Sequence, residues 1–207
     1  MNLKKRIYFF SIILLILLIG FDVNAQGLKA GEKAPDFALS YLLDENKMFT
    51  LSDFIEEETN KLIILVFAAQ WCPPCKNDLP LLETFHKKYA EQGVKILLIE
   101  TAEKKNNKLK KYFKKENLPF PVFYDKNNLI AKKYKLIPIP CYFFISKEGI
   151  IKYFQRGSIS KGQENIFEKN IVELIKNKIM TIPTINRPRI GLFTFIYKSK
   201  PGLRMGY

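Results

Sequence analysis

Apolar residues form one continuous run early in the chain and recur at helical spacing directly after it. The run Leu62 to Ala69 has the length of a strand and contains no polar residue, which is typical of a strand buried on both faces. Past Pro74, apolar side chains return every three or four positions, at Leu79, Leu82, Phe85 and Tyr89. This spacing predicts an amphipathic helix from about residue 74 to 91 that stops at Gly93. The chain therefore turns from buried strand into helix around residues 70–74.

Shorter apolar runs and helical patterns alternate through most of the remaining chain. Extended segments are predicted at 94–99, 121–124, 141–145 and 150–154, and helices at 102–116, 129–134 and 166–179. The segments 141–145 and 150–154 are predicted to form a hairpin around Lys147-Glu-Gly149. Ahead of the first buried strand, residues 29–54 have the pattern of a β-hairpin followed by a short helix that begins at Ser52. The alternation predicts an α/β fold with a mostly parallel sheet and helices on its faces.

The first 25 residues have the three parts of an export signal. Lys4, Lys5 and Arg6 form a positive start, and a nearly unbroken apolar run of 15 residues follows from Ile7 to Phe21. Small residues around 23–25 predict cleavage before Gln26. An uncleaved membrane anchor remains the alternative, because the run is short for a membrane span but long for a signal core. We therefore expect an exported protein of the periplasm or cell envelope.

The last stretch, residues 181–207, differs from the rest of the chain. It has three prolines, three glycines, five Lys or Arg and no acidic residue. We interpret it as a flexible basic extension, with surface or membrane association as the alternative. The predicted organisation is a signal peptide at 1–25, one domain at 26–180 and the extension at 181–207.

The net charge of +14 comes from lysines that are scattered along the chain. Many occur as pairs on predicted helices, such as Lys110-Lys111 and Lys114-Lys115. This pattern is typical of solvated helix faces, and no nucleic-acid-binding motif accompanies it, so no nucleic-acid partner is expected.

Cys72, Pro73, Pro74 and Cys75 stand where the predicted helix begins. A thiolate at a helix start is stabilised by the helix dipole and by free backbone N–H groups, and prolines are tolerated in the first turn. Two cysteines at this spacing close a disulfide with little backbone movement. We expect Cys72 to be the more exposed, attacking thiol and Cys75 to be the resolving thiol.

Half a zinc site and a purely structural disulfide are the alternatives for this pair. A zinc site needs more ligands, but only Cys141 and His86 remain, and they lack metal-ligand spacing. We therefore predict no metal and no cofactor other than the redox-active disulfide. Cys141 is expected to be a small buried strand residue, with a peripheral redox role left open. His86 is expected to be exposed, and no role is assigned to it.

The segment Ala69-Gln-Trp-Cys-Pro-Pro-Cys-Lys76 resembles the WCxxC active site of the thioredoxin superfamily. Upstream, the segments Gly31-Glu-Lys-Ala-Pro-Asp-Phe-Ala-Leu39 and Leu51-Ser-Asp-Phe54 are similar to the TlpA/ResA-like extracytoplasmic thiol–disulfide oxidoreductases. The resemblance covers about residues 29–178. It implies a thioredoxin fold, with a central mixed sheet flanked by helices and an added N-terminal β-hairpin.

The resemblance also implies roles for residues outside the cysteine pair. Pro140 would form a cis-proline loop that faces the cysteines and leaves the backbone of Ile139 free to pair with an extended peptide. Trp71 would shield the disulfide and offer an apolar docking surface, or simply pack beside the site. Pro80 matches the proline that bends the active-site helix in the superfamily.

Asp78 occupies the position at which ResA-like proteins carry an acidic side chain, usually Glu, that influences the cysteine pKa values. The alternative is an acid near the helix start that the dipole favours. Thioredoxins have a buried Asp as proton acceptor where this chain has Val66, which leaves Asp78 as the candidate for that task.

We therefore expect an exported oxidoreductase that reduces disulfides of other exported proteins, with apocytochrome c among the candidate clients. A membrane electron donor would restore its reduced form. Membrane association is expected only if the signal stays uncleaved. The alternative is an oxidase that uses the same residues to oxidise the thiols of its clients. A thiol peroxidase is disfavoured because no Pro-x-x-x-Thr-x-x-Cys arrangement precedes the pair. A metal- or haem-handling assembly module is disfavoured because the Cys-x-x-x-Cys and distant His of copper chaperones with this fold are missing.

Overall fold

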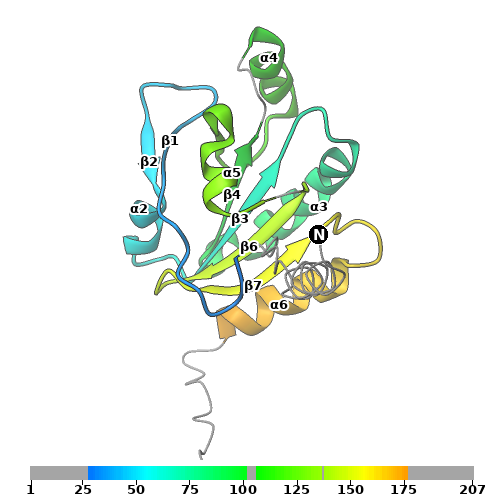
Figure 1. Cartoon of the computed structure of the whole chain (residues 1–207). Helices are drawn as coiled ribbons and strands as arrows, with labels where there is room; N and C mark the ends of the chain where they lie inside the picture. Colours follow the sequence, from blue (N-terminus) through cyan, green and yellow to red (C-terminus); the bar gives the residue numbers. More distant parts are fainter. Residues whose placement is uncertain (1–27, 102–105, 137, 177–207) are drawn as a thin grey trace, which may run out of the picture. The chain divides into compact units, whose positions relative to one another are not determined.

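The computed structural model describes residues 28–101, 106–136 and 138–176 (Figure 1). The strands are β1 (Ala38–Ser40), β2 (Met48–Thr50), β3 (Leu62–Ala68), β4 (Val94–Glu100), β5 (Val122–Tyr124), β6 (Cys141–Ser146) and β7 (Ile151–Arg156). The α-helices are α2 (Leu51–Glu56), α3 (Pro73–Tyr89), α4 (Asn107–Glu116), α5 (Leu129–Lys133) and α6 (Glu164–Lys176). Short 3₁₀ turns at Ala90–Gln92 and Lys126–Asn128 complete the order.

Five strands form the central sheet in the order β5-β4-β3-β6-β7. The β3–β4 and β4–β5 pairs are parallel, whereas β3–β6 and β6–β7 are antiparallel. The expectation of a mostly parallel sheet is therefore wrong, and the mixed sheet that the family resemblance implies is confirmed. The reason lies in the short turn between β6 and β7, since a connection of this length joins antiparallel strands only.

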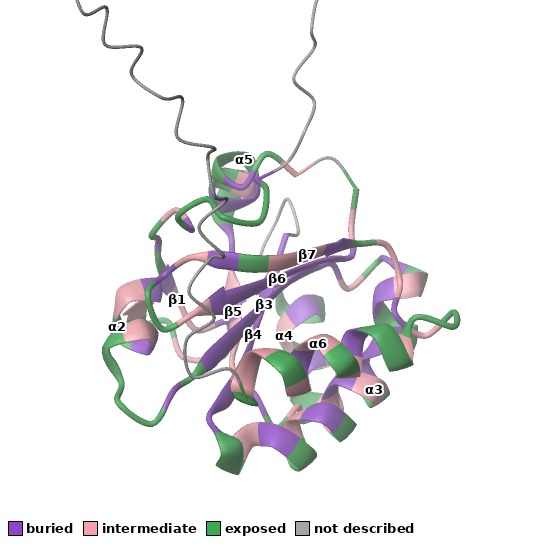
Figure 2. Cartoon of the chain, turned by 90° about the horizontal axis from the view of Figure 1, so that it is seen from below, coloured by how far each residue is buried: buried purple, intermediate pink, exposed green. Residues whose placement is uncertain are grey.

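The alternation along β3 divides the core into two layers, one on each face of the sheet (Figure 2). Leu62, Ile64 and Val66 pack in one cluster with residues of α3, α4 and α6. Ile63, Leu65 and Phe67 pack in the other, with residues of α2 and α5. Every residue of β3 is buried, as predicted from its continuous apolar run. The cysteine pair belongs to the α3 layer.

The N-terminal β-hairpin is confirmed. β1 and β2 pair antiparallel in a small separate sheet, and Tyr41 forms an isolated bridge to Phe123 of β5. Thr50 caps α2 by accepting from the backbone N–H of Asp53, whose side chain accepts from the N–H of Thr50 in return.

The helix bounds differ from the predictions by a few residues. α4 begins at Asn107 with Asn106 as its cap, and the predicted start at 102 falls among residues 102–105, which lie outside the described residues. α6 begins two residues before its predicted start. Gly93 ends the 3₁₀ turn after α3 with φ 93°, and a Cβ there would lie 2.6 Å from the carbonyl oxygen of Thr59. This close approach explains a glycine at the predicted stop.

The signal at 1–25, the extension at 181–207 and the end of the predicted last helix lie outside the described residues. Within the described ranges, no helix has the length and apolar character needed to cross a bilayer.

Candidate active site

The cysteine pair occupies the junction between β3 and α3. Cys72 is the N-cap of α3, and Pro73 and Pro74 fill the first two helical positions, where a missing N–H costs nothing. A disulfide joins Cys72 to Cys75 with 5.3 Å between their Cα atoms. The predicted strand–turn–helix context of the motif is thus present.

Both cysteines are buried. Cys72 is 3% exposed and Cys75 is 4% exposed, so the expectation that Cys72 is the more accessible of the two is wrong. The sulfur of Cys72 lies over the helix start, where it accepts a hydrogen bond from the backbone N–H of Cys75 at 3.3 Å. Both cysteine side chains belong to the apolar cluster on the α3 side of the sheet. In the disulfide form, burial therefore does not distinguish an attacking from a resolving thiol.

The loop before β6 lies at the same end of the sheet as the cysteine pair. In the antiparallel β3–β6 pairing, Cys141 stands opposite Phe67, so the residues just before Cys141 lie beside those just after β3. The Ile139–Pro140 peptide bond is cis, as the family resemblance implies. Ile139 is half-buried, and among the described residues its backbone has no hydrogen-bonding partner.

Asp78 is fully buried in α3 and is saturated with hydrogen bonds. One carboxylate oxygen accepts from Ser158 Oγ at 2.6 Å and from the N–H of Ser160 at 3.0 Å. The other accepts from the hydroxyl of Tyr142 and from the N–H of Ile159 at 3.1 Å. The alternative of a first-turn acid favoured by the helix dipole is wrong, because the first turn of α3 contains no acidic residue. The Asp78 carboxylate instead accepts hydrogen bonds from β6 and from the loop after β7. Its influence on the cysteine pKa values stays a prediction.

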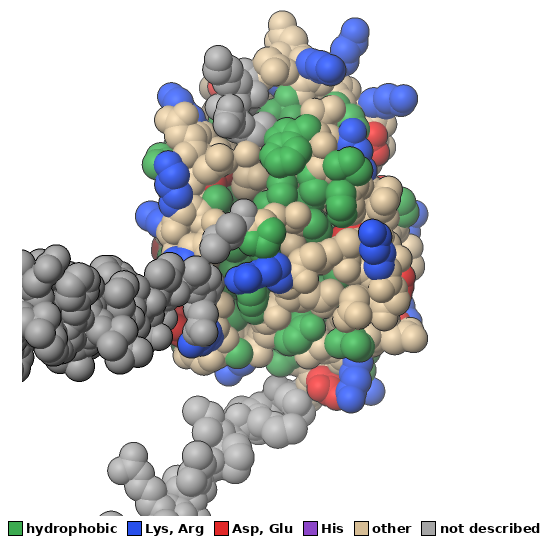
Figure 3. All heavy atoms as spheres, turned by 45° about the vertical axis from the view of Figure 1, so that its right-hand side comes forward, with side chains coloured by type: hydrophobic (Ala, Val, Ile, Leu, Met, Phe, Trp, Pro, Cys, Tyr) green, Lys and Arg blue, Asp and Glu red, His purple; other side chains and the backbone are tan. Residues whose placement is uncertain are grey.

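Trp71, next to the pair, is 64% exposed. So exposed a side chain packs little against the fold, and its role as a docking surface stays a prediction. Pro73 is exposed and Pro74 is half-buried beside it. The face drawn in Figure 3 also gathers hydrophobic side chains near its centre, with Lys and Arg dispersed around them.

Glu100, the last residue of β4, is a buried acid that the sequence interpretation missed. It is fully buried, and both of its carboxylate oxygens accept the backbone N–H of Gln70, at 3.0 and 3.1 Å. Burial raises the pKa of this carboxyl to about 7, against the smaller lowering effect of the Gln70 hydrogen bond. The sequence did contain a signal for the burial of Glu100. Val94, Ile96 and Leu98 alternate along β4, and residue 100 falls on the same buried face of the strand.

Cys141 is a buried strand thiol, as expected. Its sulfur donates to the carbonyl oxygen of Pro138 at 3.0 Å, and burial raises the pKa of the thiol to about 11. The expectation that His86 is exposed is wrong: it is half-buried, its ring lies 5.8 Å from that of Phe120, and burial lowers its pKa. No group of three or more metal-ligating side chains occurs within the described ranges.

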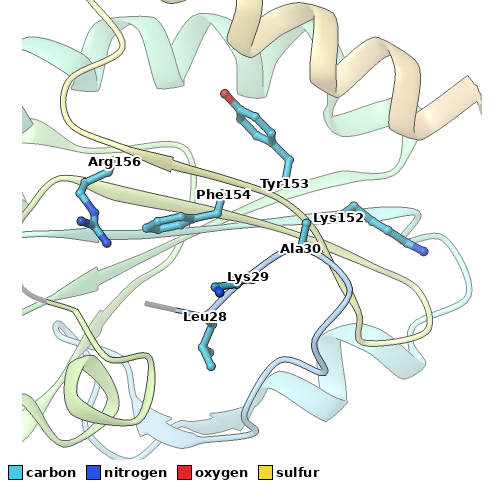
Figure 4. A pocket seen from close by; sticks show the side chains of 7 residues that line it. All are labelled: Leu28, Lys29, Ala30, Lys152, Tyr153, Phe154 and Arg156. Atoms are coloured by element: carbon cyan, nitrogen blue, oxygen red, sulfur yellow. The ribbon is translucent and has the colours of Figure 1, made fainter. Parts of the chain in front are cut away.

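A separate pocket of about 360 Å³ lies between the segment 28–30 and β7 (Figure 4). Arg156 and Phe154 extend side by side from β7 into this region, with the guanidinium carbon 5.6 Å from the ring centre. None of the predicted site residues lines this pocket.

A five-stranded mixed sheet with a CxxC disulfide at a helix start and a cis-proline loop beside it defines a thioredoxin-fold thiol–disulfide oxidoreductase. Residues 30–154 match the AhpC/TSA family, and the chain belongs to this family and to its ResA-like oxidoreductases.

Curated relatives carry the same assignment. The chain is 34% identical over 176 residues to the thiol–disulfide oxidoreductase ResA of Bacillus thuringiensis subsp. konkukian, covering 81% of this chain and 98% of that protein. It is 31% identical to ResA of Geobacillus thermodenitrificans, covering 78% and 93%. A putative thiol:disulfide interchange protein DsbE from Chlorobium tepidum has a similar crystal structure, with TM-score 0.63, 25% identity and coverage of 72% of this chain and 99% of that chain.

Proposed function

We propose that this oxidoreductase is exported and reduces disulfide bonds of other exported proteins through the Cys72/Cys75 pair. The observation that carries the proposal is the CxxC disulfide at the start of α3, beside the cis-proline loop. The charged start and apolar run of residues 1–25 support export.

The cycle needs only the two thiols. The Cys72 thiolate attacks one sulfur of the client disulfide, and the other client sulfur leaves as a thiolate that takes up a proton. Cys75 then attacks Cys72, the bond between Cys72 and the client breaks, and the second client sulfur leaves. The client gains two electrons, the Cys72/Cys75 pair loses them, and a membrane electron donor would restore the dithiol.

The local hydrogen bonding supports reduction rather than oxidation. At the helix start, Pro74 supplies no N–H at the second helical position, and Cys72 Sγ accepts from the N–H of Cys75 at the third. Fewer donors stabilise the Cys72 thiolate less, which keeps its pKa nearer the usual value and lowers the reduction potential of the pair.

The backbone of Ile139, which has no hydrogen-bonding partner among the described residues, supports a protein client. An extended peptide around the client disulfide would hydrogen-bond to this residue and place its sulfur near Cys72, while exposed Trp71 would contact the apolar side chains of the client.

Client trapping tests the proposal. The Cys75→Ser chain, expressed in its native envelope, should accumulate mixed disulfides on Cys72, and Cys72→Ser should accumulate none. Mass spectrometry of trapped species should identify exported proteins, and the N-terminus of the chain should lie at or near Gln26. Trapping on Cys75 in the Cys72→Ser chain, or turnover of hydrogen peroxide by the wild-type chain at rates above those with disulfides, would contradict the assignment.

A further inference from the structure

Glu100 points to the α3 side of the sheet, where the cysteine pair lies. Val94, Ile96 and Leu98 of β4 all pack into the α3-side cluster, and Glu100 continues their alternation. Its neighbour in the pairing with β3 is Ala68, four residues before Cys72. The Cys72/Cys75 cycle gives this buried acid no task.

Among the described residues, the carboxylate of Glu100 has unused acceptor capacity. Within the described ranges, its only hydrogen-bond donor is the N–H of Gln70, which both oxygens share. A carboxylate has about four acceptor sites, so one shared N–H leaves most of them open. A buried carboxylate with so few donors takes up a proton readily, and its pKa of about 7 expresses that tendency.

Glu100 and Cys75 line the same small cavity. Gln70, Lys76 and Tyr112 complete its polar surroundings, and about 10 Å³ is open to the centre of a water-sized molecule, on the order needed for one water.

Charged and titratable groups approach Glu100 from each neighbouring element. Lys76 of α3 lies with its ammonium 5.4 Å from the ring centre of Tyr112 of α4. Tyr124 of β5 stands in register with Glu100. Glu100 in turn contributes to the raised pKa of Tyr112, after burial and Glu116, so the two groups share one electrostatic environment.

We propose that Glu100 accepts the proton of the Cys75 thiol, through one water in this cavity, when Cys75 attacks the mixed disulfide on Cys72. The proposal rests on the Cys72/Cys75 cycle given above. The lone pair of Cys75 forms the new bond to Cys72, and the bond to the client sulfur breaks with its electrons going to the client. The proton stays on Glu100 until the departing client thiolate or solvent takes it.

Asp78 is the competing buried acid, and its bonding argues against it. All four of its acceptor sites are occupied by Tyr142, Ser158, Ile159 and Ser160, so a proton would displace an existing bond. Glu100 has no such obstacle.

Stopped-flow reaction of the reduced full chain with 5,5′-dithiobis(2-nitrobenzoate) separates the two thiols. The first thionitrobenzoate released reports attack by Cys72, and the second reports attack by Cys75 on the resulting mixed disulfide. In the wild type, the rate of the second release should change with an inflection near pH 7, the pKa of Glu100. Glu100→Gln, which keeps an acceptor for the N–H of Gln70, should remove the inflection and slow the second release at least about tenfold at pH 7, since general acid–base catalysis contributes typically 10² to 10⁴.

Four comparisons isolate the proton transfer from structural damage. The first release should keep its rate in Glu100→Gln, and the deficit should narrow as the pH rises, because hydroxide from solvent can then take the proton in place of Glu100. Glu100→Asp should restore part of the rate, and Glu91→Gln, a change at an exposed acid, should behave as the wild type.

An unchanged or faster second release in Glu100→Gln overturns the proposal, as does a wild-type profile without the inflection. The same holds if Asp78→Asn, and not Glu100→Gln, removes the inflection. Failure of the Cys72/Cys75 cycle itself looks different, whatever residue stands at 100: Cys72→Ser would keep a fast first release, or Cys75→Ser would still give a second release, for which Cys141 is the remaining thiol.

Discussion

The residue at position 74 controls how many N–H groups face the sulfur of Cys72. An N-cap side chain accepts from the second or third helical residue, and here the third, Cys75, is the donor while the second is Pro74. Pro73 stands at the first helical position, whose N–H does not point at the cap side chain. The two prolines therefore differ in their effect on the thiolate, although they are adjacent.

Replacing Pro74 by Ala should make the pair more oxidising. The restored N–H donates to the Cys72 thiolate, so the pKa of Cys72 should fall by roughly one unit and the reduction potential should rise by about 30 mV. Iodoacetamide alkylation across pH measures the first quantity, and equilibration with glutathione measures the second. Pro73→Ala is the matched control and should move neither; equal shifts in both variants would refute the donor argument.

The stability of the fold should fall as pH rises through the titration of Glu100. Its carboxyl has a pKa near the ordinary 4.5 when unfolded and about 7 when folded, so the folded state binds more protons between these values. Stability from this group is full below about pH 4.5 and is lost up to about pH 7, by on the order of 3 kcal/mol. Chemical unfolding at pH 5 and pH 8 measures the loss, which Glu100→Gln should largely remove. If the unfolding free energies of the wild type and of Glu100→Gln depended equally on pH, the loss would belong to other groups.

Asp78 connects two elements of the fold rather than stabilising α3 alone. It joins the second turn of α3 to Tyr142 in β6 and to residues 158–160 between β7 and α6. We expect these bonds to hold α3 in place relative to β6 and the loop after β7. A role in the geometry of the cysteine pair is therefore expected of Asp78 in addition to any effect on the thiol pKa values.

Asp78→Ala should cost roughly 3 kcal/mol of unfolding free energy, because truncation leaves a buried hydroxyl and buried N–H groups without their acceptor. Equilibrium unfolding in urea measures the loss. Asp36→Ala is a suitable comparison, since Asp36 also accepts from Ser52 and Phe37 but is exposed, and its loss should be clearly smaller. Equal losses would mean that burial of the Asp78 network contributes little.

The elements were predictable where local pattern determines them. The buried run of β3, the apolar stripe of α3 and the glycine at 93 carry their own signals, and these elements lie where the pattern placed them. The antiparallel placement of β6 was available only from the family resemblance, because strand order depends on long-range pairing. The partners of Asp78 lie 64 to 82 residues away in sequence, so its network could not be derived from spacing. Glu100 was missed because an acid at the end of a strand looks like a polar terminus, and its burial depends on α3 and α4 covering it.

At the scale of the whole molecule, access to the disulfide depends on what surrounds it. The two cysteines are almost fully buried, while Trp71 beside them is 64% exposed. A client must therefore be brought close by contacts with this rim before its sulfur meets Cys72. A small disulfide has little surface with which to use the rim, whereas a peptide has side chains to place against the indole and a backbone to pair with Ile139.

Trp71→Ala should accordingly separate protein substrates from small ones. We expect kcat/KM for a disulfide-bonded peptide to fall roughly tenfold, as expected for an aromatic contact worth more than 1 kcal/mol at an interface, with most of the change in KM. The rate with oxidised glutathione should stay nearly constant, since the thiols and their donors are untouched. Leu129→Ala, a truncation of a hydrophobic side chain that is 56% exposed on α5, is the matched control and should leave both substrates unaffected. A parallel fall with both substrates would mean that Trp71 acts on the reactivity of the thiols and not on the docking of the client.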